Sequence, residues 1–210
     1  MNILELFAGS RSIGKVGDKL GMNVFSVDWE KYEDIDLCID VAKLKKEDIP
    51  FVPDFVWASP DCTTYSIAAI STHRNNTEPK SEYAKKCDTT NQHFISLIKE
   101  WLEINPDMVF FIENPRGMLR KMPWMQEFKR HTIWYCQYGD ERAKPTDIWT
   151  NSDKWIPKPV CHNGNKECHH VPAPRGSKTG TQGRKGSYER SKIPEKLCYE
   201  VLESLNKPNI

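Results

Sequence analysis

Short apolar runs separated by polar turns make up the first part of the chain. Residues 2–7 form such a run, which ends at the glycine turn Ala8-Gly9-Ser10. Ile13, Val16 and Leu20 then recur at helical spacing. This pattern predicts a strand, a turn and a helix, with further strands at 23–27, in a stretch ending at 39–40, and at 54–58.

The second half of the chain continues the alternation of helix and strand. The spacing of apolar residues predicts a long helix over 91–104, a buried strand at 108–112, an apolar run at 133–136, a late strand at 147–149 and a closing helix over 193–205. Strands that alternate with helices favour an α/β fold with a doubly wound, mostly parallel sheet. Ligands of such sheets bind beyond the carboxyl ends of the strands.

Length and composition limit the size and class of the protein. With 210 residues and 24.4 kDa, the chain can form one large domain or one domain with a small appendage. We find no apolar run long enough to span a membrane and no basic-then-apolar leader, so we expect a cytoplasmic protein without a membrane partner. Seven irregularly spaced cysteines fit a reducing compartment better than a disulfide framework.

Positive charge is concentrated in one segment. The whole chain carries +1, but residues 158–192 hold eight Lys or Arg against two Glu, which gives +6 there and −5 elsewhere. The segment is also rich in glycine, which predicts contact with nucleic-acid phosphates, above all through Arg175, Lys178, Arg184 and Lys185. A solvated surface insertion is the alternative interpretation.

Several residues at the predicted strand ends suit a nucleoside. Gly9 allows close backbone approach, Asp28 can accept from ribose hydroxyls, and the indole of Trp29 offers a flat face for adenine. Asp40 could accept from an exocyclic amine. Because the turn over 9–14 is not G-x-G-x-x-G, a pyrophosphate grip is not supported, which favours a nucleoside without pyrophosphate, such as S-adenosylmethionine.

A thiol and a carboxyl follow two other predicted strands. Cys62 lies in the polar loop Ser59-Pro60-Asp61-Cys62-Thr63, and Glu113 ends the run Phe111-Ile112-Glu113. Most cysteines are inert, but this one is poorly placed to fill a core. A thiol and a carboxyl that face one pocket suit covalent addition to an electron-poor ring that must also be protonated.

The ordered motifs of the chain resemble those of the DNA cytosine-5 methyltransferases. They are L-F-A-G-S-R-S-I-G, V-D-W-E, Asp40, A-S-P-D-C-T-T-Y-S, F-I-E-N-P-R-G and D-E-R-A-K-P-T-D-I-W, in the family's order and rough spacing through about residue 150. The resemblance implies a Rossmann-like methyltransferase fold with a doubly wound mixed sheet. It also implies S-adenosylmethionine as methyl donor, double-stranded DNA as partner and a cytosine flipped out of the duplex.

The resemblance also assigns roles to individual residues. It makes Cys62 the nucleophile, Glu113 the acid at the base, and Arg142 and Lys144 the basic pair that positions the base and the nucleophile loop. The cofactor would be held by Phe7, Gly9, Asp28, Trp29, Asp40 and Pro60.

The chain departs from the family pattern at several positions. Arg11 stands near a cofactor-loop glycine of the family, and Asp61 replaces a proline before the nucleophile. The large recognition domain of the family is reduced to residues 153–192. We therefore divide the chain into a catalytic core (1–152), a basic recognition insertion (153–192) and a returning C-terminal helix (193–210), and we expect a monomer.

The insertion also contains four potential metal ligands, Cys161, Cys168, His169 and His170. They would suit one structural zinc, although Cys-x6-Cys is not a standard finger spacing, and a flexible polar loop is the alternative. Two other functions stay open. An RNA cytosine-5 methyltransferase, for example on transfer RNA, would share the catalytic set, and a non-catalytic DNA-binding or decoy protein would not need Cys62.

Overall fold

The computed structural model describes residues 1–174 and 186–205. A seven-stranded sheet has the order β3-β2-β1-β4-β7-β9-β8. The strands from β3 to β7 in this order are parallel, and β9 pairs antiparallel with both β7 and β8. The strands are β1 (Asn2–Leu6), β2 (Asn23–Asp28), β3 (Leu37–Cys38), β4 (Phe55–Ala58), β7 (Val109–Pro115), β8 (Arg130–Trp134) and β9 (Pro145–Thr150).

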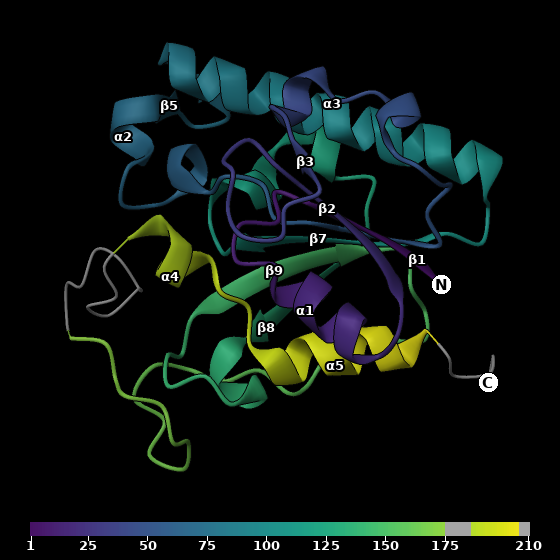
Figure 1. Ribbon diagram of the computed structural model, residues 1–210. Helices are drawn as coiled ribbons and strands as arrows, with labels where there is room; N and C mark the ends of the chain where they lie inside the picture. The colour runs from purple at the N-terminus through teal and green to yellow at the C-terminus, as the bar shows by residue number, and fades with distance from the viewer. Residues whose placement is uncertain (175–185, 206–210) are drawn as a thin grey trace.

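Helices cover both faces of this sheet (Figure 1). The long α3 (Glu82–Ile104) lies on one face, and α1 (Ser12–Lys19) packs against α5 (Glu195–Ser204) on the other. The shorter elements are α2 (Ile70–His73), α4 (Ser187–Ser191), a hairpin of β5 (Arg74–Asn75) and β6 (Glu78–Pro79), and the 3-10 turns Val41–Lys43, Lys46–Asp48, Thr63–Tyr65, Met118–Lys121, Pro123–Met125 and Tyr135–Tyr138.

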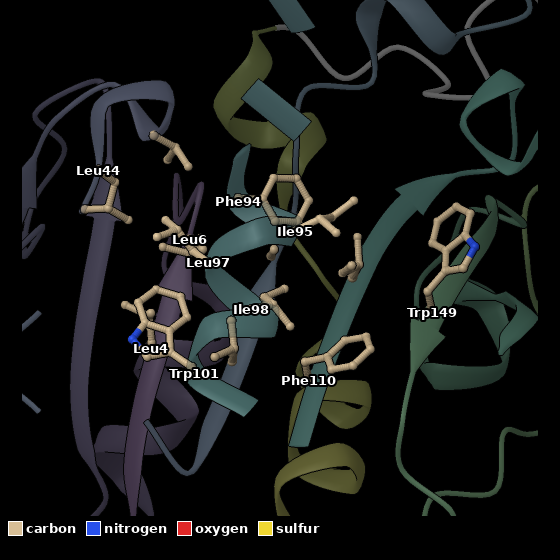
Figure 2. Packing of buried hydrophobic residues seen from close by; sticks show 14 of the residues in the cluster. Leu4, Leu6, Leu44, Phe94, Ile95, Leu97, Ile98, Trp101, Phe110 and Trp149 are labelled. Carbon is tan, nitrogen blue, oxygen red and sulfur yellow. The ribbon is translucent and has the colours of Figure 1, made fainter. Parts of the chain in front are cut away.

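Each face of the sheet has its own buried apolar cluster. On the α3 face, Phe94, Ile98 and Trp101 pack over Leu4 and Leu6 of the central strand (Figure 2). On the opposite face, apolar side chains of α1 and α5 pack over the buried side chains that the strands direct to that face. Together with the mixed strand order, this arrangement confirms the predicted Rossmann-like, doubly wound α/β fold.

The predicted elements differ from the observed ones mainly at their ends. The helix predicted from residue 91 begins at Glu82, because its first turns are polar and are capped by Ser81, whose side chain accepts from the Ala84 amide. The strand predicted to stop at Ile112 continues to Pro115, because its last residues pair with β9. None of the helices in the described ranges is long and apolar enough to cross a membrane.

Candidate active site

The register of the sheet aligns the ends of four strands. Leu6 of β1 pairs with Val27 on one side and with Ala58 on the other, and Ala58 pairs with Ile112. The residues that follow these four positions, Phe7, Asp28, Ser59 and Glu113, therefore lie along one edge. The predicted cofactor residues and the predicted catalytic residues share this edge.

A buried polar network supports the loop that carries Cys62. The Tyr65 hydroxyl donates to Asp88 Oδ1 over 2.6 Å, and Arg74 donates to both oxygens of the same carboxylate over 2.9 and 2.6 Å. Arg74 also donates to the backbone carbonyl of Thr64, and its guanidinium lies 4.2 Å from the centre of the Tyr65 ring. These contacts attach the turn that follows Cys62 to Asp88 of α3.

The end of β7 holds the same loop from its other side. The Asn114 amide donates to the Pro60 carbonyl over 2.8 Å. Gly117 lies so close that a Cβ atom there would stand 2.4 Å from the Tyr65 carbonyl oxygen. Only glycine permits this approach, which brings the segment after Glu113 against the nucleophile loop.

Glu113 is buried between two partners. The Tyr135 hydroxyl donates to Glu113 Oε1 over 2.8 Å, and Lys144 Nζ lies 3.9 Å from the same oxygen. The ammonium also lies 4.4 Å from the centre of the Tyr135 ring. These contacts fix the carboxyl at the edge of the sheet, with Lys144 only 9% exposed.

The Arg142 guanidinium is bound by the Asp140 carboxylate and keeps one N–H donor without a partner. Its Nε and Nη2 donate to Asp140, with the shortest contact at 2.6 Å, and the residue is 3% exposed. Among the buried side-chain atoms of the described residues, only Arg142 Nη1, Asn114 Oδ1 and His131 Nε2 lack a hydrogen-bond partner. A buried N–H without a partner is costly, so this donor is suited to a ligand that supplies an acceptor.

Burial disfavours the charged forms of both Cys62 and Lys144. It raises the pKa of the Cys62 thiol to about 11, although the positive charge of Lys144 works in the other direction. Burial, helped by the positive charge of Arg142, also lowers the pKa of Lys144, while Glu113 counteracts this. The thiol is therefore protonated at neutral pH in the free protein.

The predicted cofactor residues surround the turn after β1. Asp28 accepts from the Gly9 amide over 2.8 Å and from the Glu30 amide over 2.9 Å, and burial raises its pKa while these donors lower it. Trp29 is 71% exposed. Phe7 packs edge-on against Phe94, with 5.4 Å between ring centres. A rigid turn beside a carboxylate and an open aromatic face fits the adenosine part of S-adenosylmethionine.

Two further residues of this region have partners within the protein. Asp40 caps the following 3-10 turn through the Ala42 amide and lies 2.8 Å from Lys86, whose hydrogen bond lowers the pKa of Asp40. Arg11, which stands near a family glycine, has φ 54°. The arginine thus adopts the left-handed conformation that usually favours glycine, and its guanidinium donates to Ser26 and Asp18.

A cavity of about 300 Å³ opens beside the nucleophile loop. Tyr65, Ile67 and Gly117 line it, together with Arg116, Arg120 and Lys121. Arg120 is paired with the buried Asp147, so Arg116 and Lys121 are the cations of this wall that could meet a nucleic-acid strand.

The structure brings together three of the four predicted metal ligands and adds one. Cys161, Cys168 and His170 lie together with Cys136, which sequence reasoning did not group with them. His169 is not in this group, because its ring nitrogen lies 3.1 Å from the Asp140 carbonyl oxygen. Cys136 lies far from the other three ligands in the sequence, so the spacing of the residues did not indicate a shared site.

The four predicted phosphate contacts, Arg175, Lys178, Arg184 and Lys185, lie outside the described residues. Sequence reasoning also missed Tyr135 and Asp140, the partners of Glu113 and Arg142. Tyr135 lies in the apolar run over 133–136, which carries no sign of a functional role, and the sequence signal for Asp140 is its position two residues before Arg142.

Comparisons with known proteins address the fold. No protein-family model matches the sequence, and no curated protein is significantly similar to it. Among solved structures, the Entamoeba histolytica methyltransferase EhMeth matches with a TM-score of 0.56 and 10% identity, over 98% of this chain and 97% of that one. A DNMT2 mutant from Spodoptera frugiperda matches with a TM-score of 0.50 and 14% identity, over 81% of this chain.

The likeness shows a methyltransferase fold. The chain spans only 57% of the length of the Spodoptera frugiperda protein. At such low identities the likeness extends to the architecture alone and does not assign a chemistry to the site.

Proposed function

We propose that this protein is an S-adenosylmethionine-dependent cytosine-5 methyltransferase that acts on double-stranded DNA. The observation that carries the proposal is the catalytic cluster, which we define as Cys62, Glu113, Arg142 and Lys144. The charges of Lys144 and Glu113 act on the thiol of Cys62, and the buried donor of Arg142 has no partner. A binding module would not need this combination.

The cluster matches the demands of cytosine chemistry. C5 of cytosine is a poor nucleophile until a thiolate adds at C6, which makes the C5–C6 bond single and moves the double bond to C4–C5 as an enamine that can attack through C5. Cys62 supplies the thiolate. Glu113 protonates or hydrogen-bonds N3 as negative charge develops on the ring, and Arg142 Nη1 donates to O2.

The remaining steps regenerate the free enzyme. S-adenosylmethionine, when bound, would supply an electrophilic methyl group to C5 and would leave as S-adenosylhomocysteine. A base, for which water suffices, then removes the C5 proton, and the electron pair restores the C5–C6 double bond as the Cys62 sulfur leaves. Gly9, Asp28 and Trp29 would hold the adenosine part of the donor.

Lys144 favours ionisation of the Cys62 thiol. The thiol is protonated in the free protein, and the positive charge of Lys144 favours the thiolate. When a flipped base closes the site, attack at C6 draws the thiol proton off to solvent or a neighbouring base, and the ammonium stabilises the sulfur anion.

Positive charge on the adjacent surface supports a nucleic-acid substrate. Arg116 and Lys121 line the cavity beside the nucleophile loop, whereas Arg120 in the same wall is paired with Asp147. The basic segment 158–192 follows β9 in the chain and carries +6. Contacts of these residues would be mainly to phosphates, which predicts tight but weakly sequence-specific binding.

The test is methyl transfer by the full chain to duplex DNA and, separately, to transfer RNA, with nucleosides identified after digestion. We expect 5-methylcytosine in the DNA. Methylation of RNA alone would replace DNA by RNA as the substrate, and methylation at an exocyclic amine or an oxygen would overturn the mechanism.

A second arm tests the covalent step. An oligonucleotide with fluorine at C5 of cytosine should form a stable adduct with the wild-type protein, because fluorine cannot leave as a proton does. Absence of an adduct under conditions where unmodified cytosine is methylated would exclude a role for Cys62 as nucleophile.

A further inference from the structure

Four thiol and imidazole groups converge at the end of β8. Cys136 lies in the turn Tyr135–Tyr138, and Cys161, Cys168 and His170 come from the chain after β9. Their ligand atoms all lie within 4.8 Å of one another. Cys136, Cys161 and His170 are buried, with exposed fractions of 2%, 6% and 4%.

This geometry is close to that of a tetrahedral metal site. Zn–S bonds of about 2.3 Å at tetrahedral angles place sulfur atoms a little under about 4 Å apart, so a small contraction would complete the site. Cys161 Sγ and His170 Nδ1 are already 4.0 Å apart. Three thiols cannot all be paired in disulfides, whereas three cysteines and one histidine form a common structural zinc set.

We propose that Cys136, Cys161, Cys168 and His170 bind one structural Zn²⁺. On binding, the three thiols release three protons to solvent, and His170 coordinates as a neutral imidazole. The site links residues 161–170, which we call the metal lobe, to the turn that ends β8.

The apolar core of the metal lobe is small within the described residues. There, the buried apolar cluster beside the lobe consists of Trp134, Cys136, Ala143 and Cys161, with Cys168 packed against it. Val160 and Val171, which flank the lobe, are 70% and 60% exposed. A metal can replace the missing hydrophobic core in such a small unit.

The metal lobe and Val171, which follows it, also contact the segment that carries Arg142. The Val171 amide donates to the Glu141 carbonyl over 2.8 Å, and His169 lies 3.1 Å from the Asp140 carbonyl. Asp140 is the carboxylate that holds Arg142. The proposed zinc therefore acts on Arg142 as a positioning element and does not contact the base.

One local rearrangement follows from the chemistry of imidazole. With zinc on Nδ1, the proton of the neutral ring lies on Nε2. The Gly164 amide now donates to Nε2 over 3.2 Å, so it must turn away when zinc binds. We expect the amide resonance of Gly164 to be among those that shift most on metal loading.

The test is the metal content of the full chain, purified without chelators and measured by elemental analysis. We expect about one zinc per chain in the wild type and in the control His169→Ala, and less than about a tenth of that in Cys136→Ser and Cys161→Ser. A wild-type protein without zinc that contains a Cys161–Cys168 disulfide would overturn the proposal. Equal zinc in Cys136→Ser and the wild type would overturn the assignment of Cys136.

Two further measurements keep the test sharp if a serine variant fails to fold. Cys168→His exchanges one zinc ligand for another and should retain the metal. Cobalt bound to the wild type should give the intense thiolate charge-transfer bands of a tetrahedral sulfur site, and loss of these bands in Cys136→Ser with the core still folded supports the proposal. Cobalt spectra without thiolate bands would contradict it.

Discussion

The two halves of the strand-end edge are built differently. In the catalytic half, at β4, β7 and β9, Glu113, Arg142 and Lys144 are buried, and each touches an oppositely charged group. In the cofactor half, at β1 and β2, Asp28 faces its own turn and Trp29 is 71% exposed. The first half is arranged before substrate arrives, whereas the second leaves its aromatic face to be covered.

The two halves have different tasks: one stabilises charge on the reacting base, and the other binds a cofactor that exchanges in each cycle. Charges that stabilise a developing anion are most effective when they are fixed and desolvated in advance. A cofactor that must enter and leave in each cycle is better served by an open surface. Changes in the catalytic half should therefore lower the rate, and changes in the cofactor half should lower affinity.

The largest effect is expected from Cys62→Ser. A hydroxyl is not appreciably ionised near neutral pH, so methyl transfer should fall by at least about 10⁴-fold. Cofactor binding, measured as the rise in melting temperature with S-adenosylmethionine, should be unchanged. The control Cys38→Ser retains a donor for the Trp29 carbonyl and should keep full activity. Undiminished activity of Cys62→Ser would remove the covalent mechanism.

Arg142→Lys should have the next largest effect. Lysine keeps the charge but loses the paired contact with Asp140 and the additional donor, Nη1. Removing one fixed donor to a developing anion costs on the order of 10²–10³ in kcat. We expect this loss with little change in cofactor affinity, and none in the control Arg130→Lys on β8. A twofold effect or less would mean that Nη1 does not reach the base.

Sequence alone predicted the layers of the fold because apolar periodicity reports burial directly. Phe94, Ile98 and Trp101 recur at helical spacing and do cover the sheet. The periodicity could not place the start of α3, because Asp88 and Asn91 are buried polar residues that serve the nucleophile loop. Apolar patterns do not reveal such networks.

The candidate site, like the fold, could be predicted from the sequence only in part. Residues at strand ends could be placed on one edge, since parallel strands share a direction. The partners Tyr135 and Asp140, and the fourth ligand Cys136, depend on contacts between segments far apart in sequence or on side-chain orientation. Such contacts leave no mark in the sequence of a single chain.

A third prediction concerns the pH dependence of Cys62 itself. Its pKa of about 11 means that the reactive thiolate is scarce at pH 7 and grows about tenfold per pH unit up to that value. Alkylation of Cys62 by iodoacetamide, followed by peptide mass spectrometry, should therefore speed up about 100-fold between pH 7 and 9. A small reference thiol with a pKa near 8.5 levels off by about pH 9.

The variant Lys144→Met provides the matched comparison for this measurement. Without the ammonium the thiolate loses its favourable charge, so alkylation at a given pH should be slower than in the wild type. If Cys62 levels off with the reference thiol, the site is less desolvated than its burial indicates.

The smallest effect is expected in the cofactor half, from Trp29→Ala. Stacking of a base on an aromatic ring contributes about 1–3 kcal/mol, and a ring that is 71% exposed belongs at the lower end, so affinity for S-adenosylmethionine should fall about fivefold. Titration calorimetry measures this, and kcat at saturating cofactor should stay unchanged. Trp29→Phe should recover most of the affinity, and Ile156→Ala, which removes another exposed apolar side chain, should have no effect. A fall in kcat with unchanged affinity would place Trp29 in the catalytic half, and the contrast between the two halves of the edge would be lost.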